Sequence, residues 1–515
     1  MTSKDLRSGR GIQVVIPSDH RFALDEEALS KLLLAEDVRD RAVVVLSVAG
    51  AFRKGKSFLL DFFLKYLDHT YNRGEAGDNW MGSEHEPLKG FSWRGGSERD
   101  TTGLLLWSQP FKATLPNGEK VVILLMDTQG TFDSESTVRD NATVFALSTM
   151  LSSVQIYNIS QNIEEDDLQH LQLFTEYGRL AQQSSAGATP FQRLQFLIRD
   201  WSFPYEYPYG AEGGQQLLSK RLEHEELRAL RRHVAGCFAR VAAFLLPHPG
   251  LAVATDPTFT GKLAEFKTHL RELVSMLLSP ENLVPKMIEG QRVKAKDLLL
   301  YFKAYMNIFN GEELPEPKTI LEATAEANNL SAVAEAREVY DQLMEEVCGG
   351  TRPYLPPRSL EEEHQRARDK ALHAFHARRK MGGDQFANTY SAQLLKELEE
   401  QFEQLRAHNE GKNLFRMAST PAALALVTLL CWLLAAAASS AGVVSVARLA
   451  NAMALAVAAA LVMWLYSRLT GNMRDQAMKL DELVETVKNY LMQQAVGPTH
   501  GAAAVAPATP DKKHS

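Results

Sequence analysis

The sequence of residues 50–57 reads Gly50-Ala51-Phe52-Arg53-Lys54-Gly55-Lys56-Ser57, a phosphate-binding loop of the pattern G-x-x-x-x-G-K-S. Residues 42–49 before it are mostly apolar and β-branched, which predicts a buried strand, and residues 57–64 after it have the pattern of a helix. Backbone N–H groups and a helix N-terminus hold phosphate in this context. We therefore predict that Lys56 binds the β- and γ-phosphates of a nucleotide and that Ser57 ligates Mg²⁺.

The composition is that of an ordinary globular protein with more than one domain. The chain has 515 residues, of which 45% are hydrophobic and 23% are charged. Its net charge of −7 argues against nucleic acid as the main partner. Cys237, Cys348 and Cys431 lie far apart and form neither a disulfide framework nor a metal-ligand spacing, which indicates a reducing compartment. Residues 1–11 lack the apolar run of a signal peptide.

Two apolar segments near the other end of the chain predict a membrane anchor. Residues 421–438 and 449–465 contain no charged residue, and each segment is about long enough to cross a bilayer. The short turn between them predicts a helical hairpin, and the alternative is a pair of buried core helices, because both segments are rich in alanine. Lysines and arginines flank the outer ends of the hairpin, which predicts that both ends of the chain are cytosolic.

The other half of the nucleotide site is predicted by two further motifs. A polar, glycine-rich stretch of residues 72–103 ends in a threonine pair, and we expect Thr102 to join Mg²⁺ and to sense the γ-phosphate. The predicted strand of residues 120–126 ends in a D-x-x-G motif, in which Asp127 would hold Mg²⁺ through water and the Gly130 N–H would bind the γ-phosphate. This combination of motifs is specific for P-loop GTPases.

The sequence motifs for the catalytic group and for recognition of the nucleotide base are less specific than those for phosphate and Mg²⁺. Thr131 stands where small GTPases place a water-orienting glutamine, so hydrolysis needs another group. Arg53 is the nearest cation that can act as an arginine finger, although an exposed loop residue would look the same. The predicted strand of residues 194–198 ends in Arg199-Asp200, and the Asp200 carboxylate can accept hydrogen bonds from the N1–H and N2–H₂ edge of guanine.

Five motifs together resemble those of the atlastins, which are dynamin-superfamily GTPases that fuse tubules of the endoplasmic reticulum. The motifs are Gly50-Ala51-Phe52-Arg53-Lys54-Gly55-Lys56-Ser57, Trp93-Arg94-Gly95-Gly96-Ser97-Glu98-Arg99-Asp100-Thr101-Thr102-Gly103, Asp127-Thr128-Gln129-Gly130, Arg199-Asp200-Trp201-Ser202-Phe203-Pro204-Tyr205 and Leu246-Pro247-His248-Pro249-Gly250. The resemblance runs from about residue 43 through the hairpin. It implies that Arg53 becomes the catalytic arginine when two GTPase domains dimerise, and that Arg199 and Asp200 read guanine.

The predicted site follows from the motifs and the resemblance together. The predicted catalytic residues are Arg53, Lys56 and Thr102. The predicted contacts to GTP are Arg53, Lys54, Gly55, Lys56, Ser57, Phe58, Thr102, Gly130, Arg199 and Asp200. The predicted ligands of Mg²⁺ are Ser57, Thr102 and, through water, Asp127.

The predicted fold is an α/β P-loop GTPase domain with a mostly parallel sheet and helices on both faces, followed by helical regions. The expected order is a variable N-terminus (1–12), a dynamin-like GTPase domain (13–315), a linker (316–333), a three-helix bundle (334–412), a two-helix transmembrane hairpin (419–466), an amphipathic helix (472–493) and a disordered tail (494–515). The bundle follows from apolar residues recurring every three or four positions between glycine and proline breaks.

The helix expected at residues 472–493 has two faces. Its apolar face carries Met473, Ala477, Leu480, Val484, Val487 and Leu491, and its polar face carries Asp475, Asp481, Glu482, Glu485 and Lys488. The apolar face would enter the membrane interface, or would pack on the bundle or on another copy. The terminal Lys512-Lys513-His514-Ser515 resembles a dilysine retrieval signal of the endoplasmic reticulum.

The sequence thus predicts a membrane-anchored GTPase that binds GTP and Mg²⁺ and dimerises in cis and in trans to tether and fuse membranes of the endoplasmic reticulum. The expected partners are a second copy, the lipid bilayer and other hairpin proteins that shape this organelle. The alternative is a membrane tether or membrane-shaping protein whose self-association is regulated by GTP.

Overall fold

The computed structural model describes residues 9–18, 21–51, 54–75, 77, 79–81, 88–92, 101–130, 137–164, 171, 189–222, 236–250, 264–310, 314–350, 352–470, 476, 479–484 and 486–487. The chain divides into two compact units. The first contains residues 1–340 and 368–396, and the second contains residues 341–367 and 397–515. The boundary between the units therefore falls within long helices and not at the predicted domain limits.

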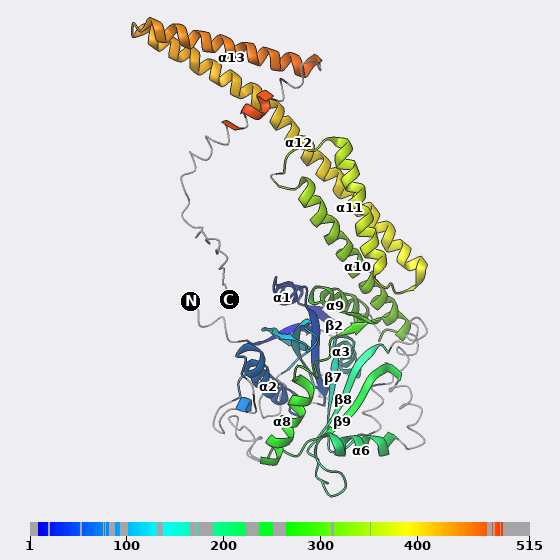
Figure 1. Ribbon diagram of the computed structural model, residues 1–515. Helices are drawn as coiled ribbons and strands as arrows, with labels where there is room; N and C mark the ends of the chain where they lie inside the picture. Colours follow the sequence, from blue (N-terminus) through cyan, green and yellow to red (C-terminus); the bar gives the residue numbers. More distant parts are fainter. Residues whose placement is uncertain are drawn as a thin grey trace, which may run out of the picture. The chain divides into compact units, whose positions relative to one another are not determined.

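A nine-stranded mixed sheet forms the centre of the first unit (Figure 1). Its strands are β1 (Gly11–Ser18), β2 (Arg21–Leu24), β3 (Ala42–Gly50), β4 (Leu104–Trp107), β5 (Phe111–Thr114), β6 (Lys120–Thr128), β7 (Val154–Ser160), β8 (Phe191–Arg199) and β9 (Phe238–Leu245). The order across the sheet is β2-β1-β4-β6-β3-β7-β8-β9, and β5 pairs with β6. The run from β6 to β9 is parallel, and the remaining pairs are antiparallel. A separate hairpin joins β10 (Met287–Ile288) and β11 (Gln291–Arg292).

Strand β3 is buried on both faces because its side chains alternate between two hydrophobic clusters. Val43 and Val45 belong to one cluster and Val44 and Leu46 to the other, and all four are fully buried. The helices that cover the sheet are α1 (Glu26–Leu33), α3 (Val138–Leu151) and α9 (Ala295–Phe309) in the first cluster, and α2 (Lys56–Leu67) and α8 (Ala264–Leu278) in the second. Helix α6 (Gly210–Leu222) lies beside β9. The prediction of an α/β fold with helices on both faces is confirmed.

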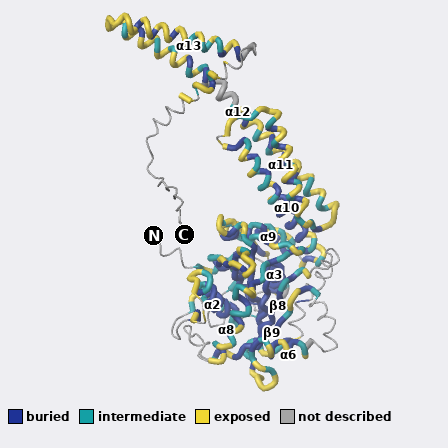
Figure 2. Tube along the Cα trace, in the orientation of Figure 1, coloured by how far each residue is buried: buried dark blue, intermediate teal, exposed yellow. Residues whose placement is uncertain are grey.

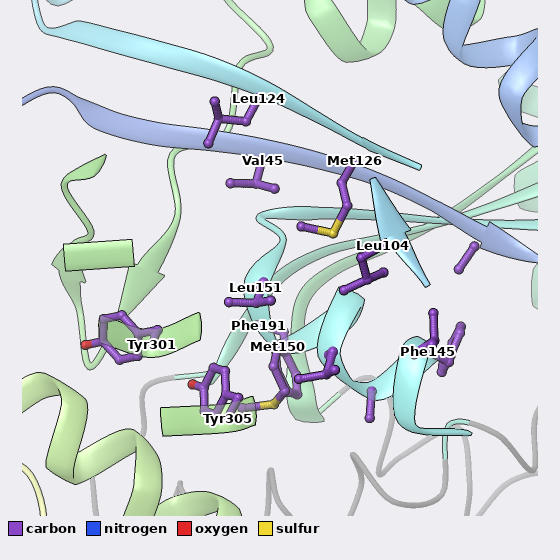
Figure 3. Close-up of a cluster of buried hydrophobic side chains, with 14 of the residues drawn as sticks. Val45, Leu104, Leu124, Met126, Phe145, Met150, Leu151, Phe191, Tyr301 and Tyr305 are labelled. Carbon is purple, nitrogen blue, oxygen red and sulfur yellow. The ribbon is translucent and has the colours of Figure 1, made fainter. Parts of the chain in front are cut away.

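The first cluster joins the sheet to helices from distant parts of the chain (Figure 3). Val45 and Met126 of the sheet face the end of α3 at Met150, and Tyr305 of α9 lies beside Met150. The Tyr305 hydroxyl forms a hydrogen bond of 3.1 Å with the hydroxyl of Thr324, which belongs to the helix after α9. The start of the helical region is therefore part of the core of the first unit.

Four long helices follow the sheet and the helices that cover it: α10 (Pro317–Cys348), α11 (Pro357–Ala377), α12 (Gly383–Ser440) and α13 (Val444–Thr470). The structure differs from the prediction of a linker at residues 316–333, because α10 begins at Pro317 and passes through that stretch without a break. The stretch contains no glycine and no further proline, so nothing in it ends a helix. Helix α12 continues from the charged helical region into the first apolar segment, and it contains Pro421 at the start of that segment.

Ion pairs hold α10 and the connection between α11 and α12 to the rest of the first unit. Arg378, which is 11% exposed at its side chain, contacts Asp297 of α9 at 3.2 Å and Glu335 of α10 at 3.0 Å. Lys296 of α9 contacts Glu338 of α10 at 2.5 Å. The Arg378 and Asp297 side chains are only 11% and 5% exposed, so removal of either one is expected to cost about 3–5 kcal/mol, because it leaves a buried charge without its partner.

The hairpin of the second unit is apolar and exposed (Figure 2). Residues Thr420–Ser440 and Val444–Ser467 have mean hydropathies of 2.2 and 1.9, and only 11% and 17% of their most apolar windows are buried. Trp432 and Leu455 are 62% and 72% exposed. A pair of buried core helices would hide such residues, so the low burial favours the membrane hairpin over that alternative.

One buried lysine gives the first unit a measurable pH dependence. Lys286 is 1% exposed, and its ammonium group donates a hydrogen bond of 2.8 Å to the Ser152 carbonyl oxygen after α3. Burial lowers the pKa of Lys286 from the ordinary 10.5 to about 7. Folding therefore releases a proton between these two pH values, and the contribution of Lys286 to stability improves as the pH rises across that window.

We predict that Lys286→Met stabilises the full-length protein in detergent more at pH 7 than at pH 9.5, as measured by its unfolding temperature. Loss of the hydrogen bond lowers the free energy of unfolding by the same amount at both pH values. The wild type also pays a free-energy penalty for releasing the Lys286 proton on folding, and this penalty becomes smaller as the pH rises. Lys318→Met is the control, because Lys318 is 76% exposed at its side chain. A difference between Lys286→Met and wild type that does not change with pH would contradict the prediction.

Candidate functional site

The phosphate loop lies between the end of β3 and the start of α2, as the sequence predicts. Gly55 precedes α2 with φ of 68°, a left-handed conformation that favours glycine. A Cβ atom on Gly55 would lie 2.8 Å from a guanidinium nitrogen of Arg199, so any other residue here would have to displace that group. Lys56 is 6% exposed and donates a hydrogen bond of 3.2 Å to the carbonyl oxygen of Ala51 within the same loop.

Three oxygen-bearing side chains converge beside this loop. Strands β3 and β6 pair in parallel with Val48 opposite Asp127, which brings the end of β6 to the start of α2. The Ser57 hydroxyl donates a hydrogen bond of 2.6 Å to Asp127 Oδ2, and the Thr101 hydroxyl donates one of 3.2 Å to the same oxygen. The two hydroxyl oxygens lie 3.3 Å apart.

The structure places Thr101, and not the predicted Thr102, at this point. The Thr102 hydroxyl and carbonyl oxygens accept hydrogen bonds of 2.9 Å and 3.0 Å from the Gln13 side chain on β1. The two neighbouring hydroxyl groups therefore have different partners, and only that of Thr101 bonds Asp127. The sequence contains no signal that distinguishes the two.

The cluster of Asp127, Ser57 and Thr101 fits a magnesium ion. Asp127 is fully buried, and its Oδ1 atom has no hydrogen-bond partner among the described residues. Burial raises the pKa of Asp127, while the nearby Lys56 charge and the hydroxyl hydrogen bonds oppose that rise. Carboxylate and hydroxyl oxygens are the ligands that Mg²⁺ prefers, and a bound cation would favour the ionised carboxylate.

The segment after Thr102 is joined to the D-x-x-G motif. The Gly103 N–H donates a hydrogen bond of 2.8 Å to the Gln129 side chain, and the Gln129 N–H donates one of 2.9 Å to the Gly103 carbonyl oxygen. Gly103 has φ of 65°, and a Cβ atom there would lie 1.9 Å from the Val15 carbonyl oxygen. Gly130, the predicted γ-phosphate contact, directly follows Gln129 and is buried. A movement of either segment is therefore transmitted to the other.

Other predicted loop residues have supporting positions. The Lys54 carbonyl oxygen accepts a hydrogen bond of 2.9 Å from the Asn158 side chain at the end of β7, so Asn158 helps to shape the loop. The Phe58 ring packs against Phe62 and Phe266, with ring centroids 5.1 Å and 6.5 Å away. The side chain of Phe58 therefore belongs to the core, and only its backbone is available to a phosphate.

Arg199 and Asp200 lie together at the end of β8. A guanidinium nitrogen of Arg199 lies 3.3 Å from Asp200 Oδ2, which also accepts a hydrogen bond of 3.2 Å from the Ser160 hydroxyl. Burial lowers the pKa of Arg199, and the Asp200 charge opposes that effect. Asp200 has φ of 59°, a left-handed conformation that is uncommon outside glycine but that aspartate adopts more readily than most residues. The pair thus carries a carboxylate that can accept hydrogen bonds from a base.

Asp61 is a site-adjacent residue that sequence reasoning missed. It lies on α2, one turn after Ser57, and is fully buried. Its Oδ1 atom accepts a hydrogen bond of 2.7 Å from the Phe91 N–H, and burial raises its pKa to about 8. A Cβ atom on Gly90 would lie 2.2 Å from the same oxygen. Asp61 therefore anchors residues 90–91, which precede the motif of residues 93–103, to α2.

Some predicted features lie outside the described residues. These are the proposed arginine finger Arg53, its neighbour Phe52, Thr131 after the D-x-x-G motif, and residues 93–100 of the second motif. Most of the predicted amphipathic helix at residues 472–493 and the whole tail at residues 494–515 lie outside them as well.

Comparisons with known proteins show which proteins this chain resembles. The family described as "Guanylate-binding protein, N-terminal domain" matches residues 19–287. The chain is 58% identical over 495 residues to Atlastin of Drosophila melanogaster, and the alignment covers 94% of this chain and 91% of that protein. It is 52% identical over 493 residues to Atlastin-2 of Homo sapiens (94% and 84% covered) and 51% identical over 479 residues to Atlastin-1 of Bos taurus (91% and 85% covered).

We predict that Thr101→Val lowers kcat for Mg²⁺-dependent GTP hydrolysis by about 10²-fold, because it removes a hydroxyl that would support the developing phosphate charge through the cation. Thr102→Val is the matched control and should lower kcat by less than about tenfold, because it loses only the neutral hydrogen bond from Gln13 to the hydroxyl and keeps the one to the backbone carbonyl. Steady-state hydrolysis over a range of Mg²⁺ concentrations measures both. A larger loss in Thr102→Val would return the predicted role to Thr102.

We also predict that Asp200→Asn lowers the preference for GTP over ATP by about 10- to 100-fold, because an amide replaces the charged acceptor for guanine. Competition binding with labelled GTP against ATP measures the preference. Glu206→Gln, which removes an exposed carboxylate nearby, is the control. Unchanged discrimination in Asp200→Asn would remove Asp200 from base selection.

Proposed function

We propose that this chain, which belongs to the atlastin family and is a GTPase, uses GTP hydrolysis to tether and fuse membranes of the endoplasmic reticulum. One observation carries the proposal. A nucleotide cluster that joins the phosphate loop, the threonine pair and the D-x-x-G motif shares its chain with an exposed apolar hairpin. Such a combination suits an enzyme whose hydrolysis cycle acts on a membrane.

Different residues of the chain would bind the phosphates, the Mg²⁺ ion and the guanine base of the nucleotide. Lys56 and the N–H groups at the start of α2 would hold the β- and γ-phosphates, and the Gly130 N–H would bind the γ-phosphate. Ser57, Thr101 and Asp127 would hold Mg²⁺, which supplies neutralisation of the negative charge on the phosphates. Arg199 and Asp200 would hold guanine at the end of β8.

Hydrolysis needs a cation near the transferred phosphate, and Arg53 is our candidate. It lies within the phosphate loop by sequence, and the chain lacks the glutamine that small GTPases use. In our proposal, two GTPase domains from opposed membranes dimerise when GTP is bound. Dimerisation then positions the Arg53 side chain beside the transferred phosphate. The Gln129 and Gly103 pair supports such coupling, because it joins the two segments that would sense the γ-phosphate.

The helical region would then transmit the change to the membrane. Arg378 joins Asp297 of the GTPase core to Glu335 of α10, so a change in the core bears directly on a long helix. Both ends of the chain would lie in the cytosol, and the basic residues that flank the hairpin, Lys412 and Arg416 on one side and Arg468 and Arg474 on the other, support this orientation. Other hairpin proteins of the endoplasmic reticulum are proposed as further partners.

The proposal predicts that full-length protein in two liposome populations mixes their lipids with GTP and Mg²⁺ but not with a non-hydrolysable analogue. Arg53→Ala should bind GTP normally, lose hydrolysis by about 10³- to 10⁵-fold and lose lipid mixing. Dequenching of a labelled lipid measures mixing, and light scattering measures clustering.

The outcomes separate the two candidate functions. Lipid mixing that depends on hydrolysis supports a fusion enzyme. Clustering without mixing by the wild type would instead favour a tether whose self-association is regulated by GTP. Full-rate turnover by Arg53→Ala would remove this residue from the mechanism.

A further inference from the structure

Three segments that are distant in sequence meet at one end of the hairpin. They are the start of the first apolar span at Thr420, the last turns of α13 at Trp464, and a helical stretch of residues 479–484 that contains Asp481. Asp481 Oδ1 accepts a hydrogen bond of 2.5 Å from the Thr420 hydroxyl and one of 2.9 Å from the Trp464 indole N–H. One carboxylate oxygen therefore joins both membrane helices to the C-terminal segment.

The burial of this cluster corrects an expectation from the sequence. The helical period predicts Asp481 on the polar face of the C-terminal helix, but it is only 8% exposed, and Thr420 and Trp464 are 2% and 3% exposed. A buried carboxylate is costly unless hydrogen bonds to it compensate for the lost water. The helical periodicity could not show this, because it describes one helix and not the surface on which that helix packs.

The position of the carboxylate fixes the orientation of the helical stretch. Asp481 faces inward, whereas Leu483 and Val487 are 61% and 51% exposed. The exposed side chains include apolar ones, so the outward surface of this stretch is not a purely polar one. Trp464 lies near the outer end of its span, where tryptophan side chains commonly mark the membrane–water interface.

We propose that Asp481 is a positioning residue that clamps the C-terminal helix onto Thr420 and Trp464 at the cytosolic base of the hairpin. Hydrogen bonds to an ionised acceptor are roughly twice as strong as neutral ones, and they hold best where water is scarce. These two hydrogen bonds hold the start of the first span and the end of the second against the same helical stretch. They also keep Leu483 and Val487 on the side that faces away from the two membrane helices. Its consequence for lipid mixing rests on the proposed function, whereas the clamp itself does not.

Hydrogen–deuterium exchange of the full-length protein in liposomes tests the clamp. Asp481→Ala should speed exchange of the amides of residues 479–487 by about 10- to 100-fold, because it removes two charge-assisted hydrogen bonds. Asp481→Asn should have an intermediate effect, since its amide oxygen still accepts. Glu482→Gln is the matched control, because this neighbouring carboxylate is exposed, and it should exchange like the wild type.

Two partner variants make the test specific. Thr420→Val and Trp464→Phe each remove one donor, and each should raise exchange in the same amides when Asp481 is present but add nothing to Asp481→Ala. GTP hydrolysis should stay at the wild-type rate in every variant, which shows that the GTPase domain is folded. Wild-type exchange in Asp481→Ala, or fully additive effects of the partner variants, would overturn the clamp.

Lipid mixing is the second readout. Asp481→Ala should lower mixing severalfold at an unchanged rate of GTP hydrolysis, and Glu482→Gln should not. Faster exchange with unchanged mixing would overturn the role of the clamp in fusion. If the wild type itself failed to mix lipids, the proposed function would fail, but the exchange result would still decide whether the clamp exists.

Discussion

The hydrogen bonds that Asp127 accepts from Ser57 and Thr101 are the contacts on which the nucleotide site depends. They join the first turn of α2, the segment before β4 and the end of β6. They form only because β3 and β6 are parallel neighbours in the sheet, with Val48 opposite Asp127. A fully buried carboxylate at that place is stable only with donors or a cation beside it, so the site requires its partners.

The same sheet explains how a change at the phosphate would spread. Gln129 and Gly103 exchange hydrogen bonds across the ends of β6 and β4, so these two strand ends behave as one element. Val43 and Val45 of β3 belong to the hydrophobic cluster that contains α9. The Tyr305 hydroxyl of α9 is hydrogen-bonded to the Thr324 hydroxyl of α10. Packed cores change between discrete arrangements and do not deform continuously, which makes this route suitable for a switch.

The membrane part follows a different physical rule. The hairpin exposes large apolar side chains that a soluble core would bury, and at one of its ends Asp481 meets Thr420 and Trp464. Helix α12 runs from Gly383 to Ser440, so the charged helical region and the first apolar span belong to one helix, in which Pro421 removes one backbone donor. Hydrogen bonding within that backbone makes a helix a stiffer connection than a flexible linker.

The sequence by itself determined the phosphate loop, the D-x-x-G carboxylate Asp127, the α/β class and the apolar hairpin, because each depends on residues that are close in the chain and on their period or spacing. Only the tertiary structure decided that Thr101 and not Thr102 meets Ser57, that Asp61 anchors Phe91, and that Asp481 is buried. Each of these depends on which surface a segment packs against. That surface is supplied by residues tens of positions away, so local propensity and periodicity carry no information about it.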